Sequence, residues 1–371
     1  MKVIVAGGGT GGHLFPGIAV AEELKARGHE VRFVGTARGI EARVCPKEGW
    51  PLDLIDVAGL KGGGPLGILK GLFRVPRALL QSLAILRREK PDLVVGVGGY
   101  ASGPMVMAAA LTGRPTAILE QNSVPGITNR MLGKLVKVVF GAFDAARSYF
   151  PRAKYQLVGN PVRKRVRESL THASSAGSDG AGTGLLVVGG SQGAHAVNEL
   201  VAEAMVILRG EGLTPPLVHQ SGPTDLEPLQ KRYAEAGLTV EVKAFIDDMA
   251  GAYRAAALAI TRAGASTLAE LTALGVPSIL IPFPHAADDH QTVNARELEE
   301  KGAARLLVQS QTSGRALASA IRELLRDDEA RRRMAAAARA LGRPTAHAVI
   351  ADALEALQKG ERMLSANPPA R

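Results

Sequence analysis

Three glycine-rich turns have the composition needed to bind phosphate groups. The first reads GGGTGGH at residues 7–13, and its Gly7, Gly9 and Gly12 satisfy the spacing G-x-G-x-x-G directly after an apolar run. The other two turns are Gly96-Val97-Gly98-Gly99-Tyr100 and Gly189-Gly190-Ser191-Gln192-Gly193. Glycines at a strand end leave backbone N–H groups exposed, and a following helix N-terminus favours anions. Together the turns predict a site for a diphosphate and for a second phosphorylated group.

A nicotinamide or flavin site is disfavoured, because the second half of its fingerprint is missing. Such a site needs an Asp or Glu near the end of the second strand to hold the ribose hydroxyls. That position reads Val34-Gly35-Thr36. For any single turn the alternative is structural, since glycine lets a strand and a helix pack closely. The repetition of the turn favours binding.

A carboxylate follows another turn in the second half of the chain. The segment RAGASTLAE at 262–270 comes after the apolar run Leu258–Thr261, so we expect residues 264–267 to form a helix N-terminus with Glu270 on its first turn. Amides at a helix start face phosphate, and a carboxylate accepts both hydroxyls of a ribose. The alternative is a capping box, in which Ser266 or Thr267 pairs with a Glu three or four residues later. Both interpretations can hold at once.

A metal site could be imagined at Asp288-Asp289-His290. This is one short segment, and the sequence identifies no second group of ligands for it. The chain also lacks Asp-x-Asp, the spacing with which many nucleotide-sugar enzymes hold a divalent cation. We therefore predict no metal and no cofactor. A leaving diphosphate would then be stabilised by helix dipoles, amides and arginine.

Two further side chains are candidates for chemistry. His13 directly follows the first glycine turn, where an imidazole could take a proton from a sugar hydroxyl. The alternative is a histidine that packs on the next helix, whose first turn we expect Pro16 to start. Arg163, in the segment GNPVR, lies where a domain junction is expected and could reach a diphosphate, or it could be a solvated charge.

The elements that must position these residues form two successive α/β patterns. Expected strands are Lys2–Ala6, Glu30–Val34, Leu93–Val97, Thr116–Leu119, Val136–Phe140, Leu185–Val188, Leu217–His219, Thr239–Val242, Leu258–Thr261, Ser278–Ile281 and Arg305–Val308. Expected helices are Ile18–Arg27, Ala78–Arg88, Pro104–Leu111, Ala196–Leu208, Thr267–Leu274 and a tail from Arg315 to Gln358 that breaks near Gly342–Pro344. Strands separated by helices of this length predict parallel sheets covered on both faces.

We therefore predict an α/β fold of two Rossmann-like, doubly wound domains that face a central cleft. Residues 1–162 form the first domain and residues 163–344 the second. The Ser/Gly/Ala-rich segment 168–184 predicts a flexible loop close to the boundary. A last helix, at about 345–360, is placed to leave the second domain and pack back onto the first.

Composition places the protein in the cytoplasm. The chain has 371 residues, 46% of them hydrophobic and 22% charged, as in a soluble globular protein. A single cysteine, Cys45, excludes a disulfide framework and a multi-cysteine zinc site. The N-terminal apolar run is too short for a signal peptide, and no run approaches the ~20 residues that span a bilayer. At a membrane, such a protein would be peripheral.

Positive charge gathers in the first half of the chain. Residues 1–167 hold 25 basic and 11 acidic side chains, and the remainder hold 20 and 24. Within segment 61–90, the basic residues Lys61, Lys70, Arg74, Arg77, Arg87, Arg88 and Lys90 are interleaved with leucine, isoleucine and phenylalanine. This pattern predicts an interfacial segment on an anionic membrane, divided by Pro76, with ~1 kcal/mol from each basic group near the surface. The alternative is a core-facing amphipathic helix with a solvated rim.

Nucleic acid is not an expected partner. Aromatic residues make up 4% of the chain, which leaves few side chains on which bases could stack. The basic residues lie among leucines and not among polar groups.

Eight ordered segments resemble one family, the MurG-type N-acetylglucosaminyltransferases of bacterial cell-wall synthesis, which convert lipid I to lipid II. The matching segments are GGTGGH with FPG (8–17), GVGGYASGP (96–104), EQN (120–122), VGNPVR (158–163), GGSQGA (189–194), FIDDM (245–249), RAGASTLAE (262–270) and DHQTVNA (289–295). The resemblance covers the whole chain. It implies the GT-B fold of two Rossmann-like domains, with UDP-N-acetylglucosamine bound mainly by the second domain and the lipid acceptor by the first.

The resemblance also implies roles for individual residues. On the donor side, Ile246 would contact uracil through its backbone, Glu270 the ribose, Gln291 the sugar hydroxyls, and Ser191 with Ala265, Ser266, Thr267, Leu268 and Ala269 the diphosphate. The site would be closed from the other side by Thr10, Gly11, Gly12, Asn122 and Arg163. His290 stands where some relatives carry a second glutamine, so either it or Gln291 would read the sugar.

The implied reaction is an inverting transfer without a metal, on the cytoplasmic face of the cell membrane. His13 is the candidate base, and Tyr100 is a candidate for organising the acceptor. Rivals on the same fold are a UDP-N-acetylglucosamine 2-epimerase and a soluble glycosyltransferase. An inactive nucleotide-sugar-binding scaffold is a further alternative.

Overall fold

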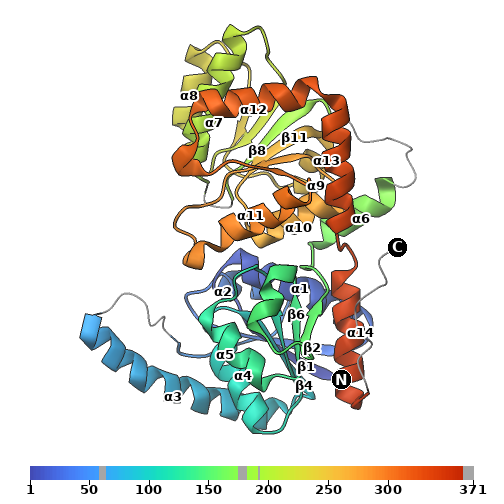
Figure 1. Ribbon diagram of the computed structural model, residues 1–371. Coiled ribbons are helices and arrows are strands. Elements are labelled where there is room, and N and C mark those ends of the chain that lie inside the picture. Colours follow the sequence, from blue (N-terminus) through green and yellow to red (C-terminus); the bar gives the residue numbers. More distant parts are fainter. Residues whose placement is uncertain (58–63, 174–181, 191–192, 362–371) are drawn as a thin grey trace. The chain divides into compact units, whose positions relative to one another are not determined.

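The chain forms two compact α/β units (Figure 1). The structure is a computed structural model that describes residues 1–57, 64–173, 182–190 and 193–361. Unit 1 comprises Met1–Arg163 together with the chain from Pro344 onward, and unit 2 comprises Lys164–Arg343. Each unit has its own parallel sheet and its own apolar core.

The sheet of unit 1 is doubly wound. Its described strands are β1 (Lys2–Gly7), β2 (Glu30–Gly35), β3 (Leu52–Leu54), β4 (Leu93–Gly98), β5 (Thr116–Glu120), β6 (Val138–Gly141) and β7 (Tyr155–Leu157). They pair in parallel in the order β3-β2-β1-β4-β5-β6-β7. The order reverses between β1 and β4, and ligands of such sheets bind at the carboxyl ends of the strands beside this switch point.

Helices cover both faces of this sheet because its strands are apolar on both faces. Val3 and Val5 of β1 pack towards α1 (Gly11–Ala26) and α14 (Ala346–Lys359). Ile4 and Ala6 face the opposite core, built with α3 (Gly64–Glu89), α4 (Ser102–Leu111) and α5 (Ile127–Leu135). A short α2 (Glu41–Lys47) and a 3-10 turn η1 (Asp144–Tyr149) complete the described elements of this unit. Alternation with period two thus produces a core on each side.

Unit 2 repeats this plan. Its described strands are β8 (Gly184–Val188), β9 (Leu217–Gln220), β10 (Glu241–Lys243), β11 (Ala256–Thr261), β12 (Ser278–Leu280) and β13 (Arg305–Leu306), in the parallel order β10-β9-β8-β11-β12-β13. Its helices are α6 (Lys164–Ala173), α7 (His195–Gly210), α8 (Leu226–Glu235), α9 (Met249–Ala255), α10 (Ala265–Leu274), α11 (His290–Glu300), α12 (Gly314–Arg326) and α13 (Asp328–Leu341), with 3-10 turns η2 (Ala287–Asp289) and η3 (Gln309–Gln311). The switch point lies between β8 and β11.

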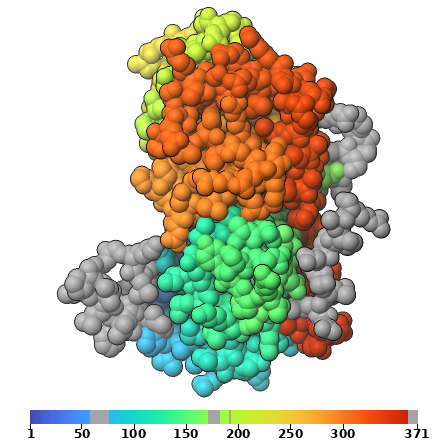
Figure 2. Space-filling model, in the orientation of Figure 1, coloured from blue at the N-terminus to red at the C-terminus, as the bar shows by residue number. Residues whose placement is uncertain are grey.

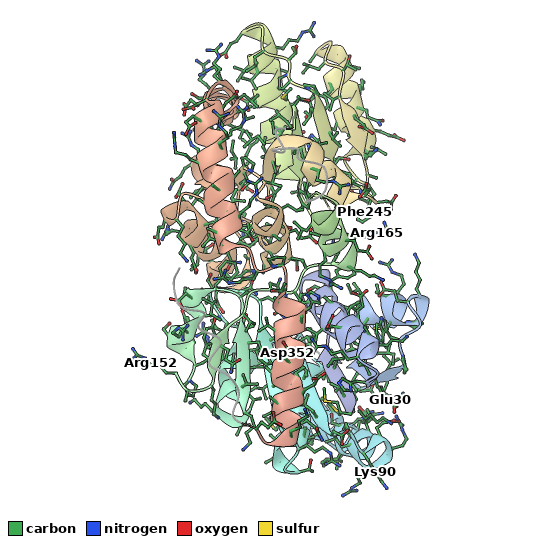
Figure 3. All side chains as sticks on the ribbon, turned by 90° about the vertical axis from the view of Figure 1, so that its right-hand side faces the viewer. Glu30, Lys90, Arg152, Arg165, Phe245 and Asp352 are labelled. Atoms are coloured by element: carbon green, nitrogen blue, oxygen red, sulfur yellow. The ribbon has the colours of Figure 1, made fainter. Side chains whose placement is uncertain are left out.

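The last helix, α14, packs on α1 in unit 1. Ile350, Ala351 and Leu354 are buried in the core that α1 covers. At the rim of this contact Arg27 Nη1 lies 2.5 Å from Asp352 Oδ1, and Asp352 is labelled on α14 in Figure 3. The apolar contacts and the ion pair together hold the C-terminal helix on the first unit.

The structure corrects several expected element bounds. α1 begins at Gly11, so Pro16 lies inside the helix and does not start it. α3 runs through Pro76, which therefore does not divide the basic and apolar stretch. Residues 168–173 of the expected loop belong to α6, which packs against α9 and α10 and buries Val166 and Ser169. No helix in the described part of the chain is long and apolar enough to cross a membrane.

Candidate functional site

The first glycine turn and the second form one backbone structure at the switch point of unit 1. Gly7, Gly8 and Gly9 have φ angles of 137°, 136° and 82°, a region that favours glycine. The Gly8 N–H donates to the carbonyl of Gly98 at 3.1 Å. A Cβ on Gly7 would lie 2.1 Å from the same carbonyl oxygen. Close packing of the two turns therefore requires glycine, whatever the turns bind.

The imidazole of His13 is held at the start of α1. The N-cap residue of α1 is Thr10, whose Oγ1 lies 3.2 Å from His13 Nδ1. The ring packs against the Gly98 backbone, since a Cβ on Gly98 would lie 2.5 Å from His13 Cδ2. Gly11 and Gly12 form the first residues of the same helix. The structure thus brings Thr10, Gly11, Gly12 and His13 together with the turn that leads to Tyr100.

Tyr100 and Asn122 lie beyond the ends of β4 and β5. Tyr100 directly follows the Gly98-Gly99 turn, and 57% of its side chain is exposed. Gln121 Nε2 donates to the carbonyl of Val97 at 2.9 Å, which ties the end of β5 to β4. Asn122 is half-buried on the same edge of the sheet. The ends of neighbouring strands in unit 1 therefore carry six of the predicted residues: Thr10, Gly11, Gly12, His13, Tyr100 and Asn122.

A buried carboxylate supports Asn122. Glu120 Oε1 accepts the backbone N–H of Asn122 at 3.0 Å, and Oε2 accepts Asn129 Nδ2 at 2.8 Å. Burial raises the pKa of Glu120 to about 7, and the hydrogen bonds from Asn122 and Asn129 oppose that rise. Glu120 thus links the end of β5 to α5.

Arg163 is the last residue of the first segment of unit 1, half-buried beyond β7 and on neither glycine turn. It follows the buried Val162. Its expected contact with a diphosphate stays a prediction.

The residues predicted to bind the donor lie in unit 2, around its switch point. Gly189 and Gly190 leave β8, whereas Ser191 lies outside the described residues. Gln220 connects this turn to the predicted base-binding segment, because its Nε2 donates to the Gly190 carbonyl and its Oε1 accepts the Ile246 N–H, both at 3.0 Å. The amide of Ile246 is therefore engaged, which leaves its carbonyl as the backbone group for a contact with uracil.

The start of α10 differs from the expected capping box. The N-cap is Gly264 with no side-chain hydrogen bond, and the buried Oγ of Ser266 has no partner among the described residues. The capping-box alternative is wrong because Ala265 is already helical, which moves Ser266 and Thr267 past the capping position. For the same reason Glu270 lies on the second turn of α10 and not on the first; it is buried there. The residues Ala265, Ser266, Thr267, Leu268 and Ala269 form the helix start itself.

Three side chains fix the loops around that helix start. Arg262 Nη1 donates to the carbonyls of Ile281 and Pro282 at 3.1 and 2.8 Å, and burial lowers the pKa of Arg262 to about 10. Asn294 Nδ2 donates to the Ala263 carbonyl at 3.3 Å. Gln291 Oε1 accepts the Phe283 N–H at 3.0 Å. The Gln291 carbonyl oxygen is thus used in the loop, which makes its amide group the candidate for reading sugar hydroxyls.

The acidic segment before α11 is organised by local hydrogen bonds. Asp289 Oδ1 accepts Thr292 Oγ1 at 2.7 Å, and His290 Nδ1 lies 2.8 Å from the Ala287 carbonyl. Among the described residues no three His, Cys, Asp or Glu side chains gather as a metal site would require. The metal-site alternative therefore finds no support in the described residues.

Sequence reasoning missed four buried polar residues that hold these turns: Glu41, Glu120, Gln220 and Asn294. Glu120 and Asn294 stand inside segments that carried the family resemblance, which was the available signal. Glu41 and Gln220 stand in no motif. Their role depends on hydrogen bonds to turns 32 and 30 residues away.

Two doubly wound units, each with a glycine turn at its switch point, are the architecture of two-domain enzymes that act on nucleotide sugars. A family model described as "Glycosyltransferase family 28 N-terminal domain" matches residues 3–141, and its C-terminal counterpart matches residues 184–351. The chain belongs to glycosyltransferase family 28, in its MurG-type branch. The predicted family and fold class are confirmed.

Relatives match along nearly the whole chain. The UDP-N-acetylglucosamine–N-acetylmuramyl-(pentapeptide) pyrophosphoryl-undecaprenol N-acetylglucosamine transferase of Myxococcus xanthus is 54% identical, over 95% of this chain and 92% of the relative. The protein of the same name from Geobacter sulfurreducens is 48% identical, over 97% and 100%. The crystal structure of MurG from Acinetobacter baumannii has a TM-score of 0.78 and 35% identity, covering 95% of this chain and 99% of that one.

Proposed function

We propose that this protein transfers N-acetylglucosamine from UDP-N-acetylglucosamine to lipid I, undecaprenyl-pyrophosphoryl-N-acetylmuramoyl-pentapeptide. The products are lipid II and UDP. One observation carries the proposal: the Myxococcus xanthus enzyme, whose name states this donor sugar and this acceptor, is 54% identical over 95% of the chain. The glycine turn at the switch point of unit 2 is consistent with a diphosphate on the donor.

The reaction is a single inverting displacement. The 4-hydroxyl of the muramoyl sugar attacks the anomeric carbon, the bond from that carbon to the UDP oxygen breaks, and a β-1,4 bond forms. His13 takes the proton of the attacking hydroxyl, and the contact between Thr10 Oγ1 and Nδ1 orients its ring. Tyr100, exposed beside this turn, organises the acceptor.

The donor is held by unit 2. The Ile246 carbonyl contacts uracil, Glu270 accepts the ribose hydroxyls, and Gln291 binds the sugar. The start of α10 with Ser191 receives the diphosphate, and the helix dipole stabilises the charge that develops on UDP. The helix start supports this assignment, because its N-cap residue Gly264 has no side chain that could bind the first amides. In unit 1, Asn122 and Arg163 are further candidates for binding substrate.

A lipid-linked acceptor calls for a membrane surface, and unit 1 exposes one candidate. Ile127, Met131 and Leu135 stand one turn apart on α5, and Ile127 is 74% exposed. In Figure 2 the region of α4 and α5, in teal and green, lies at the surface. Leu80 on the neighbouring α3 is 67% exposed, with exposed basic side chains near it on the helix. Lys61 lies outside the described residues, and only the backbone of 64–75 is described. We infer peripheral binding of this surface to the anionic cytoplasmic leaflet.

The decisive experiment is transfer of labelled N-acetylglucosamine from the UDP-sugar to a lipid I analogue, with and without EDTA. We expect a lipid II product at equal rates in both conditions. Conversion of UDP-N-acetylglucosamine without acceptor would indicate the 2-epimerase, and transfer only to water-soluble acceptors would indicate a soluble glycosyltransferase. Loss of transfer in EDTA would refute the metal-independent mechanism.

A further inference from the structure

An internal carboxylate lies inside the first glycine turn. Glu41, the first residue of α2, has 1% of its surface exposed. Its Oε2 accepts the N–H of Gly9 at 2.7 Å. Its Oε1 accepts the N–H of Thr36 at 2.8 Å and the Thr36 hydroxyl at 3.0 Å. This one side chain therefore joins the ends of β1 and β2.

Three glycines make the space that this carboxylate occupies. A Cβ added to Gly8, Gly35 or Gly39 would lie 2.4, 2.3 or 2.1 Å from an atom of the Glu41 side chain, closer than any real contact. Gly35 and Gly39 have no positive φ that would otherwise demand glycine. The buried carboxylate of Glu41 therefore explains why positions 35 and 39 have no side chain.

The position of Glu41 also changes the meaning of the G-x-G-x-x-G pattern. In a dinucleotide fold the amides of this turn bind a substrate pyrophosphate, and an acid at the end of the second strand binds ribose. Here the Gly9 amide already donates to a carboxylate, and a second anion beside it would be repelled. The turn continues directly into Thr10 and His13, so whatever fixes Gly9 also fixes the start of α1.

We propose that Glu41 is a positioning residue: its carboxylate takes the place of a bound phosphate in the first glycine turn and thereby holds Thr10 and His13 in their reactive arrangement. The acceptor diphosphate then binds donors other than the Gly9 amide. This inference rests on the proposed function only for the role of His13. The hydrogen bonds of the turn are independent of any substrate.

The test compares Glu41→Ala and Glu41→Gln with the wild type, with Glu48→Ala as a control at the exposed end of the same helix. Misplacement of a catalytic group by about 1 Å costs on the order of 100-fold. We expect kcat of Glu41→Ala to fall about 100-fold with the donor KM changed less than about threefold, and Glu41→Gln, which retains one acceptor oxygen, to lie between. Sodium formate should restore part of the lost kcat in Glu41→Ala and leave the wild type and Glu48→Ala unchanged.

Hydrogen exchange without substrate separates this inference from the proposed function. We expect the peptide containing Gly9 to Gly12 to exchange faster in Glu41→Ala and to slow again in formate, whether or not the protein acts on lipid I. Unchanged exchange in this peptide would overturn the positioning role. Full kcat in a folded Glu41→Ala, or a loss that formate does not relieve in either measurement, would overturn it as well.

Discussion

Substitution of Glu120 by glutamine should flatten the dependence of stability on pH. Burial raises the pKa of this carboxyl from 4.5 to about 7 in the folded protein. At 1.36 kcal/mol per pH unit this corresponds to about 3 kcal/mol. The folded state binds the proton more tightly than the unfolded state, so this stabilisation is fully present below pH 4.5 and is lost as pH rises to about 7. The glutamine variant has no such titration.

The measured quantity is the free energy of unfolding of unit 1 between pH 4.5 and pH 8. Trp50, the sole tryptophan of the chain, is buried in the core of this unit and reports its unfolding in urea by fluorescence. The stability of Glu120→Gln relative to the wild type should increase by about 3 kcal/mol across this range. Altered hydrogen bonds with Asn122 and Asn129 would change the free energy of unfolding by the same amount at every pH. Such a change does not affect the pH dependence that is measured.

The control is Arg152→Gln, at an exposed position of unit 1 labelled in Figure 3. Its profile should run parallel to that of the wild type, because neither arginine nor glutamine titrates between pH 4.5 and pH 8. Parallel profiles for Glu120→Gln and the wild type would refute the reasoning, since they would mean that this buried carboxyl binds its proton equally well in both states.

Further substitutions test the predicted residues of each unit and the membrane surface. His13→Ala should lower kcat by about 100-fold or more with little change in donor KM, and near-normal turnover would remove it as the base. Glu270→Ala should weaken UDP binding about 10- to 100-fold by calorimetry, through the loss of charge-assisted hydrogen bonds, and unchanged affinity would contradict its ribose contact. Gln220→Leu removes the hydrogen bonds to the Gly190 carbonyl and the Ile246 N–H, and it should also weaken UDP binding about tenfold or more while sparing unit 1. Replacing Ile127 and Met131 with serine should reduce co-sedimentation with anionic vesicles, and binding that is equal on neutral vesicles at all salt concentrations would refute the electrostatic part.

The alternation of strands and helices was predictable from the sequence because its cause is local. Strands that are apolar on both faces appear in the sequence as short apolar runs, and the helices that connect them appear as longer helical patterns. The usual arrangement of such elements is a doubly wound parallel sheet. The short edge strands β3 and β7 were missed, since three residues carry no clear period. The start of α1 was missed because the helix begins with two glycines, Gly11 and Gly12, and glycine has a low helix propensity.

The glycine turns and the segment that carries Glu270 were likewise readable in the sequence, because each directly follows an apolar run that forms a strand. The first residue of α10 could not be read from the sequence. Whether Ser266 caps α10 or lies within it depends on where the first helical residue falls, and the packed loop of Arg262 and Asn294 determines that.

What the sequence determined by itself is therefore the alternation of strands and helices, the position of the glycine turns and the family. The supporting hydrogen bonds were decided by tertiary structure alone. Glu41 appeared as an ordinary glutamate after a strand that lacked the expected acid, yet its carboxylate lies in the first glycine turn, 32 residues away. Glu120 and Gln220 similarly bind groups on other elements. A sequence motif reports only on residues that are close along the chain. A buried polar group, in contrast, forms its hydrogen bonds only after the folded sheet has brought the ends of separate strands together.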